Sequence, residues 1–147
     1  MRTIITILCM LIIVFSAGPN VSYAQDDTQA KRFENVEWKT IVHIKYHTGK
    51  KGRALEIMNN HFKKAGEKAG TLGPIRYDLR TGEWDILLIW DMKGGIEDMT
   101  WERNPNGIAW RKALNEQEGG ADKAQALLDE YSSLISDSYA DIAMLKK

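Results

Sequence analysis

The feature that most constrains the fold of this chain is the segment from Arg76 to Met92, which is typical of a β-hairpin with two chemically different faces. A two-residue loop at Thr81-Gly82 would place Tyr77 opposite Ile86. One face of the hairpin is then apolar and consists of Ile75, Tyr77, Leu79, Trp84, Ile86, Leu88, Trp90 and Met92. The other face is largely charged and consists of Arg76, Asp78, Arg80, Glu83, Asp85, Leu87, Ile89 and Asp91. We therefore expect a sheet with one dry side and one open side.

Regular spacing on both sides of this hairpin predicts two more strands and two helices. Residues 38–47 alternate with period two, as a strand with one apolar and one polar face does. Apolar residues recur every three or four positions from Lys50 to Ala69 and again from Ala124 to Ile135, which is the spacing of amphipathic helices. Residues 137–145 alternate again and are expected to form the last strand.

The segment between the hairpin and the second helix is expected to be less regular. It contains two short helical pieces, at 96–101 and 108–114, on either side of the turn signal Asn104-Pro105-Asn106-Gly107. The main elements follow the order strand, helix, strand, strand, helix, strand. This order predicts an α+β, ferredoxin-like βαββαβ sandwich, in which a four-stranded antiparallel sheet carries both helices on its dry face. We expect this domain over residues 37–147, after a flexible leader over residues 25–36.

The N-terminus predicts export. Arg2 precedes an apolar run over residues 4–17, and Ser22-Tyr23-Ala24 has small residues at the positions that a signal peptidase reads. We expect a signal peptide over residues 1–24, and a periplasmic or secreted protein with no membrane association after cleavage. An uncleaved anchor is the alternative, but the run is shorter than the roughly 20 residues of a spanning helix. Cleavage would remove Cys9, the only cysteine, and with it any disulfide or thiol chemistry.

Charge and motifs exclude several classes of function. The sequence has 20 basic and 20 acidic residues, so electrostatics favours neither nucleic acid nor an anionic membrane as a partner. It has no Gly-rich phosphate loop and no Gly-x-Ser-x-Gly elbow. His43 and His47 share a strand face but would lie about 13 Å apart, too far to hold one metal ion. We expect neither a metal nor a cofactor.

The uncovered face of the predicted sheet has a small apolar centre. The two central strands contribute Ile41, Leu87 and Ile89 to it, with His43 and Lys45 on the same face. An apolar centre within charged surroundings is typical of a protein interface. We expect a homodimer that packs these faces together. For His43 and Lys45 the alternative is that they form part of a solvated polar rim.

Two local stretches resemble a known family. Residues Val42 to Lys50 and Ile89 to Met92 resemble the first strand-to-helix junction and the third strand of NIPSNAP-type and stress-responsive barrel domains. The element order over residues 37–145 resembles the dimeric α/β-barrel superfamily to which these domains belong. The resemblance implies a homodimer in which two ferredoxin-like sheets pack into a barrel.

The resemblance also implies where a ligand would bind. In oxygenase-like members of the superfamily the pocket lies between sheet and helices, and by that resemblance Trp90, Trp101, Trp110 and His61 would line a flat apolar pocket here. Ordinary core packing is the alternative for these side chains. Haem-degrading members take an axial histidine from the segment after the third strand, and this sequence has no histidine after Met92. That departure argues against haem oxygenase activity.

Three functions are consistent with this sequence. The first is an exported dimeric domain that binds a small apolar or aromatic molecule without a cofactor. The second is a cofactor-independent oxygenase or isomerase, which would need an acid or base such as Tyr46, His61 or Asn104. The third is a non-catalytic homodimeric assembly module. Nothing in the sequence decides whether the chain is an enzyme, because a fold does not fix a function.

Overall fold

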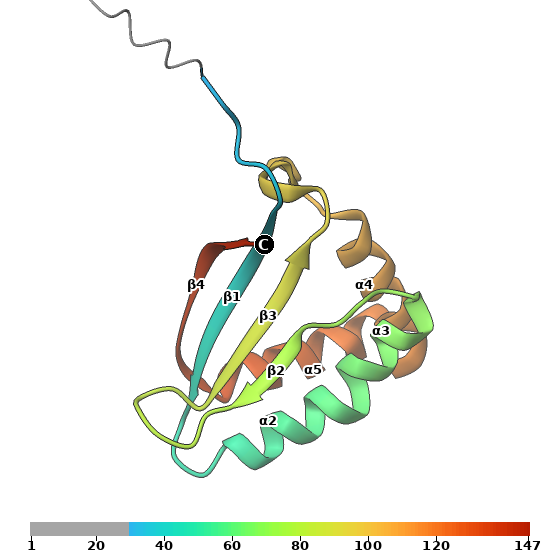
Figure 1. Cartoon of the computed structure of the whole chain (residues 1–147). Coiled ribbons are helices and arrows are strands. Elements are labelled where there is room, and N and C mark those ends of the chain that lie inside the picture. The colour runs from blue at the N-terminus through green and yellow to red at the C-terminus, as the bar shows by residue number, and fades with distance from the viewer. Residues whose placement is uncertain (1–29) are drawn as a thin grey trace, which may run out of the picture. The chain divides into compact units, whose positions relative to one another are not determined.

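A four-stranded antiparallel sheet with the strand order β2-β3-β1-β4 forms one layer of the molecule (Figure 1). The computed structural model describes residues 30–147. The strands are β1 (Val36–Tyr46), β2 (Ile75–Asp78), β3 (Ile86–Met92) and β4 (Ile135–Lys146). Because β1 and β3 are central and β2 and β4 are the edges, the sheet has the predicted ferredoxin-like topology.

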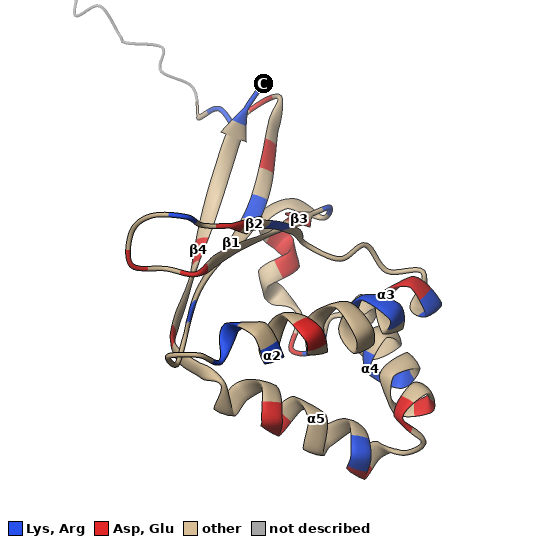
Figure 2. Ribbon diagram, turned by 90° about the horizontal axis from the view of Figure 1, so that it is seen from below, with Lys and Arg blue, Asp and Glu red and all other residues tan. Residues whose placement is uncertain are grey.

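The helices form a second layer on one side of this sheet (Figure 2). They are α2 (Lys51–Ile57), the π-helix η2 (Met58–Phe62), α3 (Lys63–Ala69), the 3-10 helix η3 (Gly95–Thr100), α4 (Pro105–Glu118) and α5 (Ala121–Ser133). The segments α2, η2 and α3 are continuous and form the first predicted helix, with a π-helical turn in its middle. None of the helices within residues 30–147 combines the length and the apolar character that a membrane span requires.

The core lies between the layers and has two parts. The first part packs the sheet against α2, η2 and α5, and its buried members are Ile44, Tyr46, Ala54, Ile57, Ile86, Leu88 and Leu134. The second part packs α3, α4 and α5 together, and its buried members are Ala65, Ala113, Leu114 and Ala124. Because one face of the sheet is packed in this way, the other face is left open. The prediction that the helices cover a single face is confirmed.

The hairpin between β2 and β3 differs from the sequence prediction. Its strands stop at Asp78 and restart at Ile86, and Tyr77 pairs with Leu87 instead of Ile86. A shift of one residue moves a side chain to the other face of a sheet. Ile75 and Tyr77 therefore lie on the open face, where they are 57% and 51% exposed, and the predicted two-residue turn is wrong.

Two loop residues account for the longer connection. The Trp84 ring lies on the open face, with ring centroids 5.9 Å from His43 and 4.9 Å from Tyr139. The Asp85 carboxylate accepts a hydrogen bond of 2.8 Å from the backbone N–H of Tyr46, at the end of β1. A tight turn would give up both interactions, because it would continue the ladder through these residues. The prediction that Trp84 belongs to the core is therefore wrong.

The Asn-Pro-Asn-Gly signal follows the short helix η3, as predicted, and begins α4, which is longer than the sequence predicted. Asn104 is the N-cap of α4, and its side-chain oxygen accepts a hydrogen bond of 2.8 Å from the backbone N–H of Asn106. Pro105 occupies the first helical position, where its missing N–H costs nothing. The second short piece predicted from the sequence is thus part of a helix of 14 residues.

Candidate functional site

The open face of the sheet carries an apolar patch that extends across all four strands. Its members, which we call the open-face patch, are Ile41, His43, Ile75, Tyr77, Trp84, Leu87, Ile89 and Tyr139. Cross-strand pairing aligns Tyr77, Leu87, His43 and Tyr139 in one row. A contiguous apolar surface of this kind marks an interaction site more often than isolated exposed side chains do.

All five residues predicted at the interface lie on this face. Ile41, His43, Leu87 and Ile89 belong to the open-face patch. Lys45 lies beside it and pairs with Glu83 at 3.2 Å, between Nζ and Oε1. Ile75, Tyr77 and Trp84 also belong to the patch, although a two-residue hairpin turn predicts them on the covered face.

His43 is the most constrained polar residue of the open-face patch. Its ring stacks on Tyr139 with centroids 4.3 Å apart, and its Nε2 lies 3.6 Å from a carboxylate oxygen of Asp141. Its Nδ1 atom is buried without a hydrogen-bond partner in the described part of the chain. No group of three or more metal-ligating side chains within residues 30–147 is arranged to hold a metal ion.

Charged residues border the apolar patch along β1. Lys39 Nζ lies 2.5 Å from Asp91 Oδ1 and 2.8 Å from Glu37 Oε2. Lys147 also pairs with Glu37. Hydrogen bonds from Lys147 and Lys39 lower the pKa of Glu37 to about 2. The open face therefore combines an apolar centre with a rim of paired charges, which is the arrangement of a protein interface.

A second polar cluster lies between the sheet and the helices. The hydroxyl oxygens of Tyr46, from β1, and Tyr131, from α5, are 3.1 Å apart, and we call these residues the tyrosine pair. Both hydroxyls reach the thioether of Met58, at 3.7 Å from Tyr46 and 3.5 Å from Tyr131. Burial raises the pKa of both phenols, so both hydroxyl groups stay protonated at neutral pH.

The tyrosine pair lies at the π-helical turn and next to a positive charge. Met58 is the first residue of η2, and single π-helical turns within α-helices are frequent at functional sites. The next residue, Asn59, accepts a hydrogen bond of 3.1 Å from Arg76 on β2. Arg76 therefore reaches the residue next to Met58, and its charge opposes the effect of burial on the pKa of both phenols.

His61, the fourth residue of η2, has an acidic partner at the end of α4. Its Nδ1 lies 2.7 Å from Oε1 of Glu118, the last residue of α4. Gln117 also donates to that oxygen, at 2.8 Å. Burial alone would raise the pKa of Glu118, but the hydrogen bonds from His61 and Gln117 outweigh it and hold the pKa below its usual value. The pair fastens η2 to the end of α4.

The tryptophans predicted at a ligand pocket lie in three separate places. Trp90 packs against the first core part. Trp110 packs against the second core part, and its Nε1 donates a hydrogen bond of 3.0 Å to the carbonyl of Phe62. Trp101 follows η3 and is 55% exposed. Phe62 links Trp110 to the tyrosine pair, because its carbonyl binds Trp110 and its ring centroid lies 5.0 Å from that of Tyr131.

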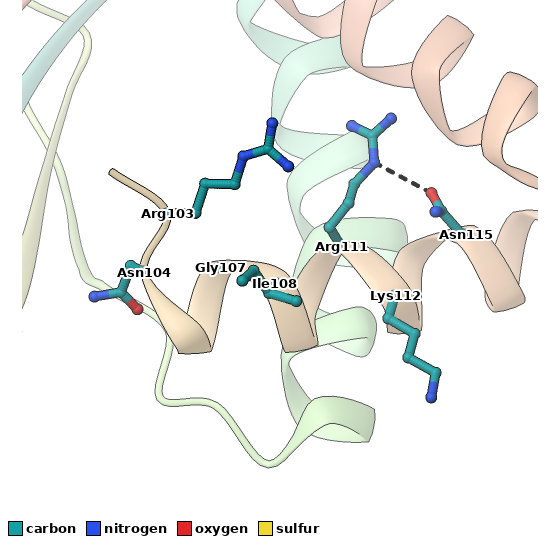
Figure 3. Close-up of a pocket in the computed structure, with 7 residues that line it drawn as sticks. All are labelled: Arg103, Asn104, Gly107, Ile108, Arg111, Lys112 and Asn115. Atoms are coloured by element: carbon teal, nitrogen blue, oxygen red, sulfur yellow. Dashed lines mark hydrogen bonds between the residues drawn. The ribbon is translucent and has the colours of Figure 1, made fainter. Parts of the chain in front are cut away.

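An open hollow lies on α4, and none of its lining residues belongs to the open-face patch, the tyrosine pair or the three tryptophans (Figure 3). Its volume is about 520 Å³, and it is lined by Arg103, Asn104, Gly107, Ile108, Arg111, Lys112 and Asn115. The side chain of Asn104 is already engaged as the helix cap. The lining contains no residue that would act as a general base at neutral pH.

Comparisons with known proteins give the fold a family context. A NIPSNAP family protein with unknown function from Agrobacterium tumefaciens str. C58 is 11% identical, with a TM-score of 0.52, over 80% of this chain and 96% of that one. This chain has the fold of a NIPSNAP family protein. The resemblance inferred from the sequence is thus confirmed at the level of the fold.

Two further solved structures are similar to a smaller extent. An uncharacterised NIPSNAP domain protein from Burkholderia xenovorans is 10% identical, with a TM-score of 0.46, over 72% of this chain and 91% of that one. A dimeric ferredoxin-like protein from an uncultured marine organism is 6% identical, with a TM-score of 0.45, over 78% of this chain and 90% of that one. No protein-family model and no curated protein matches the sequence.

Proposed function

We propose that this chain is an exported, homodimeric domain that binds a small apolar or aromatic molecule between its sheet and its helices. The observation that supports binding is the tyrosine pair. Two hydroxyl groups lie within an otherwise apolar layer, beside a flexible thioether and a π-helical turn. Ligand sites are mostly apolar with a few converging polar groups, and this cluster has that composition.

The open-face patch supports the homodimer. Ile75, Tyr77 and Tyr139 are 57%, 51% and 44% exposed, and they surround less exposed apolar residues on the central strands. Packing two such faces together would remove these side chains from water at no cost in backbone hydrogen bonds, since both sheets are already paired. The oligomeric state of the purified protein tests this part of the proposal.

The signal peptide predicted over residues 1–24 supports export. That segment lies outside the described residues, so the support comes from the sequence alone. Fractionation of cells that express the full chain, followed by mass determination of the exported form, tests it. A protein that keeps residues 1–24 would contradict the proposed cleavage after Ala24.

The binding function is tested by a screen of small aromatic and apolar molecules against the purified protein labelled at the methionine methyl groups. We expect bound compounds to shift the NMR signal of Met58 and to leave that of Met99 unchanged, because Met99 is 60% exposed on η3. Tyr46→Phe should weaken binding, whereas Tyr77→Phe removes a hydroxyl from the open face and should leave it intact. Absence of any binder up to millimolar concentration would contradict the proposal and would favour a non-catalytic assembly module.

A cofactor-independent oxygenase or isomerase is the second candidate. The hydroxyl group of Tyr46 favours it in one respect, since a buried phenol that stays protonated can donate a hydrogen bond to a substrate oxygen. We would then expect Tyr46→Phe to abolish turnover of a bound compound while binding persists. Turnover equal to that of the wild type in both Tyr46→Phe and His61→Ala would remove both residues from any catalytic role.

A further inference from the structure

We infer that the ligand of the tyrosine pair is an aromatic or apolar carboxylate, whose oxygens are held by Tyr46, Tyr131 and Arg76. The inference rests on the proposed small-molecule function and names the chemical class of the ligand. Three observations carry it: an incomplete set of hydrogen bonds at the two phenols, free donor capacity on Arg76, and an aromatic wall beside them.

The hydrogen bonds of the tyrosine pair leave one donor poorly satisfied. Two neutral phenols have two O–H groups, and the contact of 3.1 Å between them uses one. The other has the sulfur of Met58 within 3.5 to 3.7 Å, and a thioether is a weak acceptor. A ligand oxygen at the position of this sulfur would complete the set, and buried donors without good acceptors are costly.

Arg76 supplies the positive charge that favours a carboxylate over a neutral oxygen. One of its five N–H groups donates to Asn59 at 3.1 Å. Its Nε forms an ion pair with Asp78 Oδ2 at 3.7 Å, which is too long for a hydrogen bond, so this contact uses none of its N–H donors. Because guanidinium groups bind carboxylates through paired N–H donors, the remaining donors fit this ligand group.

The position of Arg76 also indicates where the ligand enters. β2 is an edge strand of four residues (Figure 1), and its Arg76 reaches Asn59 of η2. The side chain of Arg76 is 29% exposed there and faces the helices, whereas Tyr77 next to it faces the open side. A carboxylate that arrives at this edge would meet Arg76 first and the tyrosine pair behind it.

The body of the ligand would take the place of the Met58 side chain. Met58 packs against the first core part, and its unbranched side chain adopts alternative rotamers easily. The ring of Phe62, 5.0 Å from that of Tyr131 in an edge-to-face arrangement, provides an aromatic surface. These surroundings select a flat apolar group attached to the carboxylate.

The test compares 1-naphthoate with 1-naphthamide, which has nearly the same shape and no charge. We expect naphthoate to bind the purified protein about tenfold more tightly, and its binding to shift the NMR signal of Met58. Arg76→Gln should remove this preference, whereas Arg80→Gln, an exposed arginine in the following loop, should keep it. Tyr46→Phe and Tyr131→Phe should each weaken naphthoate binding, and near-ultraviolet circular dichroism would confirm that both variants fold.

Equal affinity for the two compounds, or an unchanged preference in Arg76→Gln, would overturn the carboxylate inference. If neutral compounds from the wider screen shift Met58 while naphthoate does not, the inference fails and the proposed binding function stands. If no compound of either kind shifts Met58, both fail.

Discussion

Glu118 illustrates how a single residue joins packing to pH dependence. It is the last residue of α4, where the helix dipole disfavours a negative charge. Hydrogen bonds from His61 and Gln117 nevertheless hold its pKa below the usual value, against the effect of burial. A carboxyl group with a lowered pKa stabilises the fold above its unfolded pKa, and this contribution is lost as the pH falls through its folded value.

We predict that Glu118→Gln lowers the free energy of unfolding by about 1 kcal/mol at pH 7, because it removes a charged partner from His61. The difference from the wild type should begin to shrink below about pH 4.5, where the unfolded chain takes up the proton, and should vanish once the folded carboxylate is protonated at its lower pKa. Urea unfolding from pH 7 to pH 3 measures this. Glu102→Gln, at an exposed position after η3, serves as the control. A difference that stays constant over this range would contradict the prediction.

At the scale of elements, the start of α4 is set by its cap. Asn104 accepts the hydrogen bond from the backbone N–H of Asn106, so one of the free N–H groups of the first turn is satisfied. We predict that Asn104→Ala lowers the free energy of unfolding by about 1 kcal/mol and that Asn104→Asp is nearly neutral, because aspartate also caps helices. Thermal unfolding measures both. Asn106→Ala is the control, because it keeps the backbone N–H that donates to Asn104. If Asn106→Ala lowers the free energy of unfolding as much as Asn104→Ala does, the proposed role of the cap is contradicted.

Periodicity predicted the elements well, whereas their boundaries and the hairpin register depended on contacts that periodicity cannot detect. β1 and the α2–α3 helix begin and end within two residues of their predicted limits. The hairpin was wrong because Trp84 packs on Tyr139, which is distant in sequence and on the opposite edge of the sheet. The local alternation assigns an apolar residue such as Trp84 to the covered face. Packing on the open face is equally favourable for it, because the ring of Tyr139 is there to cover it.

The candidate site was only partly predictable for the same reason. Tyr46 was identified from the sequence, but Tyr131 was placed only in an apolar helix stripe, and the two meet through the packing of α5 on β1. Arg76 was assigned to the charged open face by the incorrect register, although it faces the helices. The π-helical turn at Met58 leaves no recognised signal in the residue pattern. Groups that meet from different elements require the tertiary structure.

At the scale of the whole molecule, the two faces of the sheet have separate roles in the proposed function. The covered face holds the tyrosine pair, and the open face holds the patch through which we propose that two copies associate. The two sites share the central strand β1. Its Tyr46 side chain lies on the covered face and its His43 side chain lies on the open face. Substitutions at one face can therefore test one function without removing side chains from the other.

The homodimer is best tested with two isoleucines of nearly equal exposure. Ile75 in the open-face patch is 57% exposed, and Ile108 on α4 is 56% exposed. We predict that Ile75→Lys raises the dimer dissociation constant at least about tenfold, because a lysine at an apolar interface loses hydration, and that Ile108→Lys leaves it unchanged. Sedimentation velocity over a range of protein concentrations measures the constant. A specific dimer with a micromolar dissociation constant should be detectable at about 10 μM protein. A wild-type protein that is monomeric at that concentration would contradict association through the open face. Equal effects of the two lysine substitutions would contradict it as well.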